Sequence, residues 1–200
     1  MNTLINRIVI ATGSAAKVRE IGRILADLDC EFIPQSELGI SSVAETGMTF
    51  VDNALIKARH ATEKSGLAAI ADDSGLVVDA LNGRPGVHSA RYAGAEAKDD
   101  DNVEKLLAEL SQVPDGKRGA HYECAAVWVS PDVAIKPKVG QGQWHGRIIS
   151  ERRGKGGFGY DPVFLDERLT KTGAEMSMEE KNRQSHRGKA FRELRALMLK

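Results

Sequence analysis

The chain has 200 residues, which is enough for one sizeable domain and short for two. Its 28 basic residues balance its 28 acidic residues, so the whole chain lacks the basic excess of a general nucleic-acid binder. No segment approaches the roughly 20 consecutive apolar residues of a membrane span. Charge and composition therefore argue against nucleic-acid and membrane partners, but they allow a local pocket for one small anion.

The N-terminal segment and the cysteines bear on the cellular compartment. The first apolar run is too short for the core of a signal peptide. Cys30 and Cys124 form no CxxC pair and stand beside apolar residues, as reduced buried thiols do. We therefore expect a cytoplasmic protein.

The first half of the chain alternates between strands and helices. Residues 7–11 form a β-branched run, and the apolar residues after Ser14 recur at helical spacing. A second helix is expected from its cap at Thr49 to Ser65-Gly66. Residues 67–71 then predict a buried strand that runs into a turn at Asp72-Asp73-Ser74-Gly75.

Strands gather in the second half. The further predicted elements are an apolar segment at 76–81, a turn at 82–86, a helix at 99–110, strands at 121–130, about 143–149 and 162–165, and two C-terminal helices, the first with a Ser177-x-x-Glu180 capping box. Helices that alternate with strands early and strands that cluster later indicate an α/β fold with a mixed sheet, formed by one domain over residues 1–200.

The first cluster with chemical potential lies between the first strand and the first helix. A tight turn into a helix presents free backbone N–H groups at the positive end of the helix dipole, which favours phosphate binding. Ser14 and Lys17 add side-chain donors there, although the Walker pattern is absent. The alternative is an N-cap serine followed by a solvated lysine.

The second cluster consists of Glu45, Asp72 and Asp73. Mg²⁺ prefers oxygen ligands and commonly takes one or two carboxylates together with substrate phosphates. Because neighbouring strand side chains point to opposite faces, we do not expect Asp72 and Asp73 to reach one ion together. The alternative is a surface turn in which the aspartates cap backbone groups. The buried run before the pair favours a ligand site at the end of a strand.

The third cluster is a glycine-rich loop at Gly154–Asp161. It contains a formal GxGxxG, but the strand-like segment after it argues against a dinucleotide-binding fold. The glycines permit close approach of a ligand, and Phe158 and Tyr160 could stack on a base. The alternative is a hairpin loop whose aromatic side chains lie in the core.

The fourth cluster is Lys181 with His186 and Arg187. His186 and Arg187 can donate hydrogen bonds to the carbonyl oxygen of a 6-oxopurine, and Arg187 can also stack on a base. The alternative is a solvated basic loop between two helices. The remaining histidines show no spacing typical of zinc ligands, and no Gly-x-Ser-x-Gly is present.

Together these clusters resemble the inosine-triphosphate pyrophosphatase family, whose members remove inosine and xanthosine triphosphates. Five segments carry the resemblance in family order over nearly the whole chain: IVIATGSAAKVREI, ETGMTFVDNALIKARHA, AIADDSGLVVDALNGRPGVHSARYAG, GGFGYDPVFL and MEEKNRQSHRGKAF. The resemblance implies an enzyme that hydrolyses ITP, dITP and XTP to the monophosphate and pyrophosphate. It also implies an elongated mixed β-sheet flanked by helices, and a homodimer.

The resemblance further implies a role for each matching residue. Asp73 is expected to be the general base, and Glu45 and Asp73 are expected to bind Mg²⁺. Residues expected to hold the triphosphate are Thr12, Gly13, Ser14, Ala15, Ala16, Lys17 and Ser74, and those expected to hold the nucleoside are Phe158, Gly159, Tyr160, Asp161, Lys181, His186 and Arg187.

The chain departs from the family pattern in its first motif. The usual form is Thr-Gly-Asn-x-Gly-Lys, and Ser14 and Ala16 replace the Asn and the second Gly. Serine can still cap a helix and donate, whereas alanine requires φ < 0 where glycine was free. Two other functions remain open: a pyrophosphatase with a different base preference, and a non-catalytic nucleotide sensor or RNA-binding module.

Overall fold

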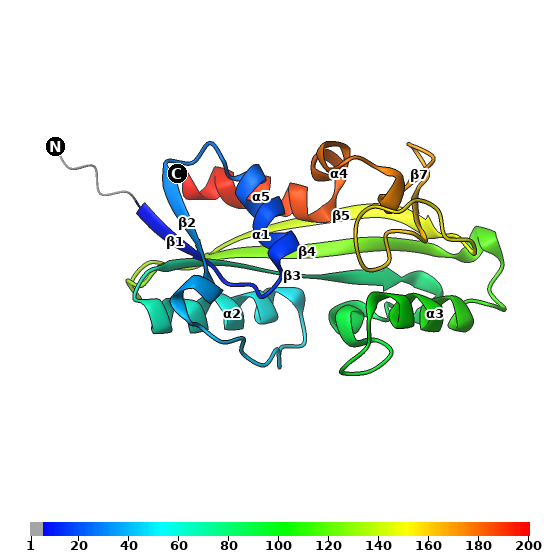
Figure 1. The fold of residues 1–200 in the computed structure, drawn as a ribbon, viewed down its shortest axis with the longest axis horizontal. Helices are drawn as coiled ribbons and strands as arrows, with labels where there is room; N and C mark the ends of the chain where they lie inside the picture. Colours follow the sequence, from blue (N-terminus) through cyan, green and yellow to red (C-terminus); the bar gives the residue numbers. More distant parts are fainter. Residues whose placement is uncertain (1–5) are drawn as a thin grey trace. The chain divides into compact units, whose positions relative to one another are not determined.

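The computed structural model describes residues 6–200 and contains seven strands in one mixed sheet, ordered β2-β1-β3-β4-β5-β6-β7 (Figure 1). The strands are β1 (Asn6–Ile10), β2 (Cys30–Pro34), β3 (Ala68–Val78), β4 (Gly119–Val129), β5 (Lys138–Ile148), β6 (Phe164–Asp166) and β7 (Lys171–Thr172). The helices are α1 (Ala15–Ile24), α2 (Phe50–Ser65), α3 (Asp99–Glu109), α4 (Met178–Gln184) and α5 (His186–Met198). β1 runs parallel to β2 and β3, whereas β6 runs antiparallel to β5 and β7. The predicted α/β fold with a mixed sheet and flanking helices is confirmed.

The chain divides into two compact units. Unit 1 comprises the chain up to Asp73 with Cys124–Gly142 and Arg187–Lys200, and unit 2 comprises Ser74–Glu123 and Gln143–His186. Strands β3, β4 and β5 each contribute residues to both units.

In unit 1 the alternation of side chains along the strands creates a core on each face of the sheet. Ile8 and Ile10 of β1 belong to a cluster that includes residues of α1 and α5. Val9 and Ala11 belong to a second cluster, formed with alanines of α2. Figure 1 shows α1 and α5 on one face of these strands and α2 on the other. The turn after β1 therefore leads directly into a helix that is packed against the sheet.

Unit 2 has a separate aromatic core. Tyr122, Trp144 and Phe164 pack together, with ring centroids of the Tyr122–Phe164 pair 4.7 Å apart. Helix α3 adds Val103 and Leu106 to this cluster.

Several predicted boundaries are correct and others need correction. Ser14, Thr49 and Ser177 cap α1, α2 and α4 as predicted, and Gly66 ends α2 in a left-handed conformation. The predicted turn at residues 72–75 is wrong, because β3 continues through it to Val78. Aspartate is disfavoured in strands, but here both aspartates have charged partners that offset this cost. β5 begins earlier than predicted, and β2 was not predicted at all.

Candidate active site

The turn between β1 and α1 forms one wall of a cavity of about 170 Å³ in unit 1. Ser14 Oγ accepts from the backbone N–H of Lys17 at 3.4 Å, and the Ser14 N–H donates to Thr12 Oγ1 at 3.2 Å. Ala15 and Ala16 lie in the first turn of α1, so Ala16 needs no left-handed backbone. The cavity lining includes Thr12, Gly13, Ser14, Lys17, Glu45 and Lys57. The predicted phosphate cradle is therefore lined by a helix N-terminus and two lysines.

Asp72 lies buried in β3 and faces cationic side chains. Its Oδ2 accepts from Lys17 Nζ at 3.1 Å and from Arg187 Nε at 3.1 Å. Burial alone would raise the pKa of Asp72, but the charges of Lys17 and Arg187 hold it far below the usual range. Asp72 is therefore a permanent anion beside the phosphate cradle.

Asp73, the next residue of β3, has different hydrogen-bond partners. Its Oδ2 accepts from Asn53 Nδ2 at 3.1 Å, and its Oδ1 lies 3.4 Å from Lys57 Nζ. Burial raises the pKa of Asp73; Lys57 opposes this shift and Glu45 adds to it. Because the partners of Asp72 and Asp73 lie on different elements, the predicted separation of the two carboxylates onto opposite faces agrees with the contacts.

Lys57 joins the two carboxylates that were predicted to bind Mg²⁺. Its Nζ donates to Glu45 Oε1 at 2.7 Å as well as to Asp73. Burial lowers the pKa of Lys57, but Asp73, Asp72 and Glu45 together raise it above its ordinary value. Two carboxylates that already converge on one cation fit a hard divalent ion. Within residues 6–200 no three His, Cys, Asp or Glu side chains gather into a metal site, so substrate oxygens would have to complete the coordination.

Asn53 and Lys57 were not singled out from the sequence, although a signal for them exists. They are four residues apart on α2, so they lie on one face of the helix. Asn53 is fully buried, and its Oδ1 accepts from the N–H of Gly47 at 2.8 Å. It therefore connects the segment after Glu45 to Asp73.

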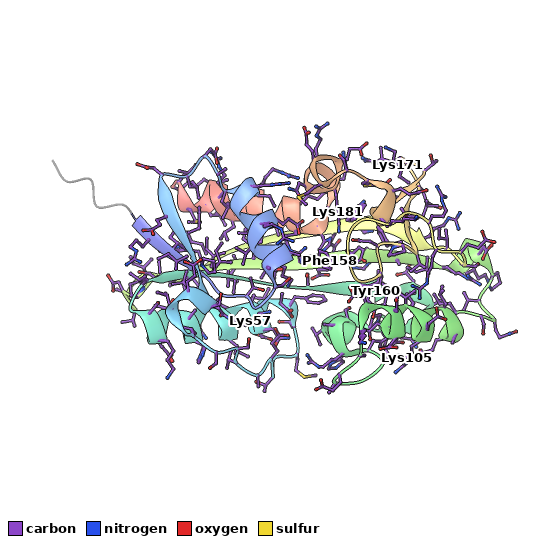
Figure 2. The ribbon with its side chains drawn as sticks, in the orientation of Figure 1. Lys57, Lys105, Phe158, Tyr160, Lys171 and Lys181 are labelled. Atoms are coloured by element: carbon purple, nitrogen blue, oxygen red, sulfur yellow. The ribbon has the colours of Figure 1, made fainter. Side chains whose placement is uncertain are left out.

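The glycine-rich loop of unit 2 is organised by Asp161. The buried Asp161 carboxylate accepts from the N–H of Phe158 at 2.8 Å and from Lys181 Nζ. Lys181 Nζ lies 4.6 Å from the centre of the Phe158 ring, and Figure 2 labels both residues. Phe158 keeps 41% of its surface exposed, so the loop presents an aromatic ring, and the cation that contacts this ring, Lys181, is buried.

Other residues predicted for the nucleoside are buried. Tyr160 is 4% exposed, and its hydroxyl donates to the Ser89 carbonyl at 2.8 Å, as the alternative core reading expected. His186 stacks on Tyr122 with ring centroids 4.6 Å apart. Ser74, which was predicted to hold the triphosphate, is half-buried in β3 and belongs to unit 2. Arg187 belongs to unit 1, where it contacts Asp72 and Glu20; its role at a base stays a prediction.

Comparison with known proteins identifies the family of this chain. The model of the Ham1 family matches residues 8–197. This chain belongs to the Ham1 family. A dITP/XTP pyrophosphatase of Pectobacterium atrosepticum is 52% identical over 186 residues, which cover 93% of this chain and 94% of that protein. A protein of the same name from Methylococcus capsulatus is 53% identical and covers 92% of each chain. The resemblance inferred from the five segments is confirmed.

Solved structures agree with this assignment. A Ham1 protein from Coxiella burnetii superposes with a TM-score of 0.90 at 43% identity, covering 98% of this chain and 99% of its own. The Staphylococcus aureus Ham1 protein gives a TM-score of 0.86 at 40% identity, covering 96% and 98%. None of the helices in residues 6–200 is both long and apolar enough to cross a bilayer.

Proposed function

We propose that this chain hydrolyses dITP, ITP and XTP to the nucleoside monophosphate and pyrophosphate, and so removes non-standard purines from the nucleotide pool. The relatives that cover nearly the whole chain carry the name dITP/XTP pyrophosphatase. The structural observation that carries the proposal is Asp73, a buried carboxylate with a raised pKa in the same unit as the cavity formed by the N-terminus of α1 and two lysines. This combination supplies a proton acceptor and a receptor for an anion.

The triphosphate is assigned to the residues that line the cavity or adjoin it. Free N–H groups at the start of α1 and the charge of Lys17 offset negative charge that grows on the leaving pyrophosphate. Ser14 orients that first turn through its cap, and Ser74 follows Asp73 on β3. Ala15 and Ala16 contribute their backbone only.

Asp73 is assigned the role of general base. It accepts a proton from a water molecule as the water oxygen forms a bond to phosphorus and the α–β phosphoanhydride bond breaks, with pyrophosphate as the leaving group. Asn53 fixes the orientation of the carboxylate, which keeps one oxygen directed away from the amide. Glu45 and Asp73 would hold Mg²⁺, which, when bound, offsets charge on the phosphate oxygens.

The nucleoside is assigned to unit 2. The exposed ring of Phe158 offers a stacking surface, and Gly159 at φ 61° shapes the loop beside it. The predicted set in unit 2 also includes His186 and the buried pair of Lys181 and Asp161, whereas Arg187, which was predicted with them, belongs to unit 1. Donors that face position 6 accept inosine and xanthosine but leave the amino group of adenine unpaired, a difference typically worth about 1–3 kcal/mol.

The assembly and the compartment follow the same proposal. We assign the protein to the cytoplasm, where nucleoside triphosphates are made and used, and its two cysteines are free thiols within the described residues. The homodimer stays a prediction from the resemblance, and the single domain over residues 1–200 stays a prediction from chain length and the order of elements.

The deciding experiment measures pyrophosphate release from ITP, XTP, dITP, GTP and ATP, with and without Mg²⁺. Metal-dependent release that favours ITP, XTP and dITP supports the proposal. Release that favours another base would indicate a pyrophosphatase of different specificity. Nucleotide binding without any release would indicate a sensor, and RNA binding that weakens steeply with salt would indicate the RNA-binding alternative.

A further inference from the structure

A buried chain of four alternating charges lies behind the phosphate cradle of unit 1. Glu20 of α1 pairs with Arg187 of α5, Arg187 pairs with Asp72 of β3, and Asp72 pairs with Lys17 of α1. The three contacts measure 2.9, 3.1 and 3.1 Å. Two positive and two negative groups balance within the chain of contacts.

Burial makes these contacts depend on one another. The side chains of Asp72 and Arg187 are 0% and 1% exposed, and that of Glu20 is 8% exposed. Removing one partner from a buried pair leaves the other charge uncompensated, with no water to screen it. Only Lys17, at 19% exposure, reaches the lining of the cavity.

Asp72 connects the two cations of this series of ion pairs. A single oxygen, Oδ2, accepts from both Lys17 and Arg187, and no described residue donates to Oδ1. A guanidinium can bind both oxygens of a carboxylate at once, and it then compensates more of the negative charge that would otherwise hold the lysine. Glu20 accepts from Arg187 Nη1 and thereby holds that end of the guanidinium away from Asp72.

We propose that Glu20 is a positioning residue, which acts through Arg187 and Asp72 to hold Lys17 in the cavity for the polyphosphate of the substrate. Glu20 lies three residues after Lys17 on the same face of α1. Lys17 therefore links α1 to β3 directly, and Glu20 links α1 to β3 through Arg187 of α5. The proposal rests on the proposed function of this cavity.

The protein contains a second ion pair between the α1 region and α5, which serves as a matched control. Asp27, just after α1, pairs with Arg195 of α5, with Arg195 Nε 2.8 Å from Asp27 Oδ1. The Asp27 side chain is 61% exposed, and this pair does not touch the cavity. Asp27→Asn therefore removes a carboxylate from the same pair of elements without touching Lys17.

The test is a double-mutant cycle read by calorimetric titration with inorganic tripolyphosphate at fixed ionic strength. In Glu20→Gln we expect Arg187 to turn toward Asp72 and loosen the contact of Asp72 with Lys17. The side chain of Lys17 must then be ordered when tripolyphosphate binds. Tripolyphosphate affinity should fall about tenfold, the scale set by the rotamer freedom of a lysine. In a Lys17→Ala background the same substitution should change affinity by less than about twofold. Asp27→Asn should bind as the wild type does.

Each outcome decides between positioning and another role. Unchanged or tighter binding by Glu20→Gln, or an equal loss in the Lys17→Ala background, overturns the proposal. If Glu20→Gln does not fold, Glu20→Asp keeps the charge on a shorter side chain, and its smaller loss must likewise vanish with Lys17→Ala. A wild-type protein that binds tripolyphosphate but releases no pyrophosphate from ITP would refute the proposed function, and the double-mutant cycle would still test the role of Glu20.

Discussion

Asp73→Asn is the substitution that most directly tests the mechanism. The change replaces one carboxylate oxygen by an amide nitrogen of the same size, so the site should keep its shape. The remaining side-chain oxygen can still accept from Asn53 or from Lys57, the two donors that contact Asp73. What is lost is the capacity to take a proton from water, together with the charge of one of the two carboxylates that we propose to hold Mg²⁺.

General-base catalysis typically contributes about 10²–10⁴-fold, so kcat should fall at least ~100-fold, equivalent to about 2.7 kcal/mol of transition-state stabilisation. Nucleotide affinity, measured by titration without turnover, should change far less, because Lys17 and the start of α1 are untouched. Asp52→Asn, which removes an exposed carboxylate at the start of α2, is the control and should stay within about twofold of wild type. Turnover by Asp73→Asn near the wild-type rate would exclude Asp73 as the base.

Three further results are expected from the same site. Because burial raises the pKa of Asp73, its carboxylate should take up a proton at a pH above the ordinary aspartate value of 3.8 in the protein without Mg²⁺; a carboxyl titration followed by NMR with a midpoint at or below 3.8 would contradict this. Lys57→Met should have a lower Tm than wild type in EDTA, because Glu45 and Asp73 then lack their shared cation, and Mg²⁺ should raise its Tm by more than it raises that of wild type. The exposed Lys64→Met should match wild type in both measurements. Gly157→Ala should raise KM for ITP with little change in kcat, because Gly157 has φ 74° and a Cβ would overlap the Asp161 carboxylate; an unchanged KM would show that the loop tolerates the strain.

Local chemistry let the sequence predict the helices closely. Helix starts need side-chain acceptors for free N–H groups, and Ser14, Thr49 and Ser177 supply them at the predicted positions. Gly66 ends α2 because its backbone adopts the left-handed conformation that glycine permits. These features depend on a few neighbouring residues, so a sequence is enough to find them.

The missing parts of the site depend on residues distant in the chain. The strand was expected to end in a turn at Asp72 and Asp73. Strands disfavour aspartate, and only the cations that surround the two carboxylates in space explain why β3 continues. Glu20 shows the same limit: its partner Arg187 is 167 residues away in the chain, and nothing in the local pattern of α1 distinguishes a buried glutamate from an exposed one. Local sequence patterns can predict where a site lies, but the partners that balance its charges can be identified only from the folded structure.

The alternation of a β-strand explains how two adjacent aspartates come to have opposite properties. Asp72 points to Lys17 and Arg187, and these two cations hold its pKa far below the ordinary value. Asp73 points the other way, where burial and Glu45 outweigh Lys57 and raise its pKa. Carboxylates whose environments separate their pKa values can take different tasks. The permanently charged Asp72 is suited to anchor a cation, and Asp73, which is closer to exchanging its proton, is suited to act as the base. A one-residue shift in the register of β3 would exchange the two faces and remove both functions at once.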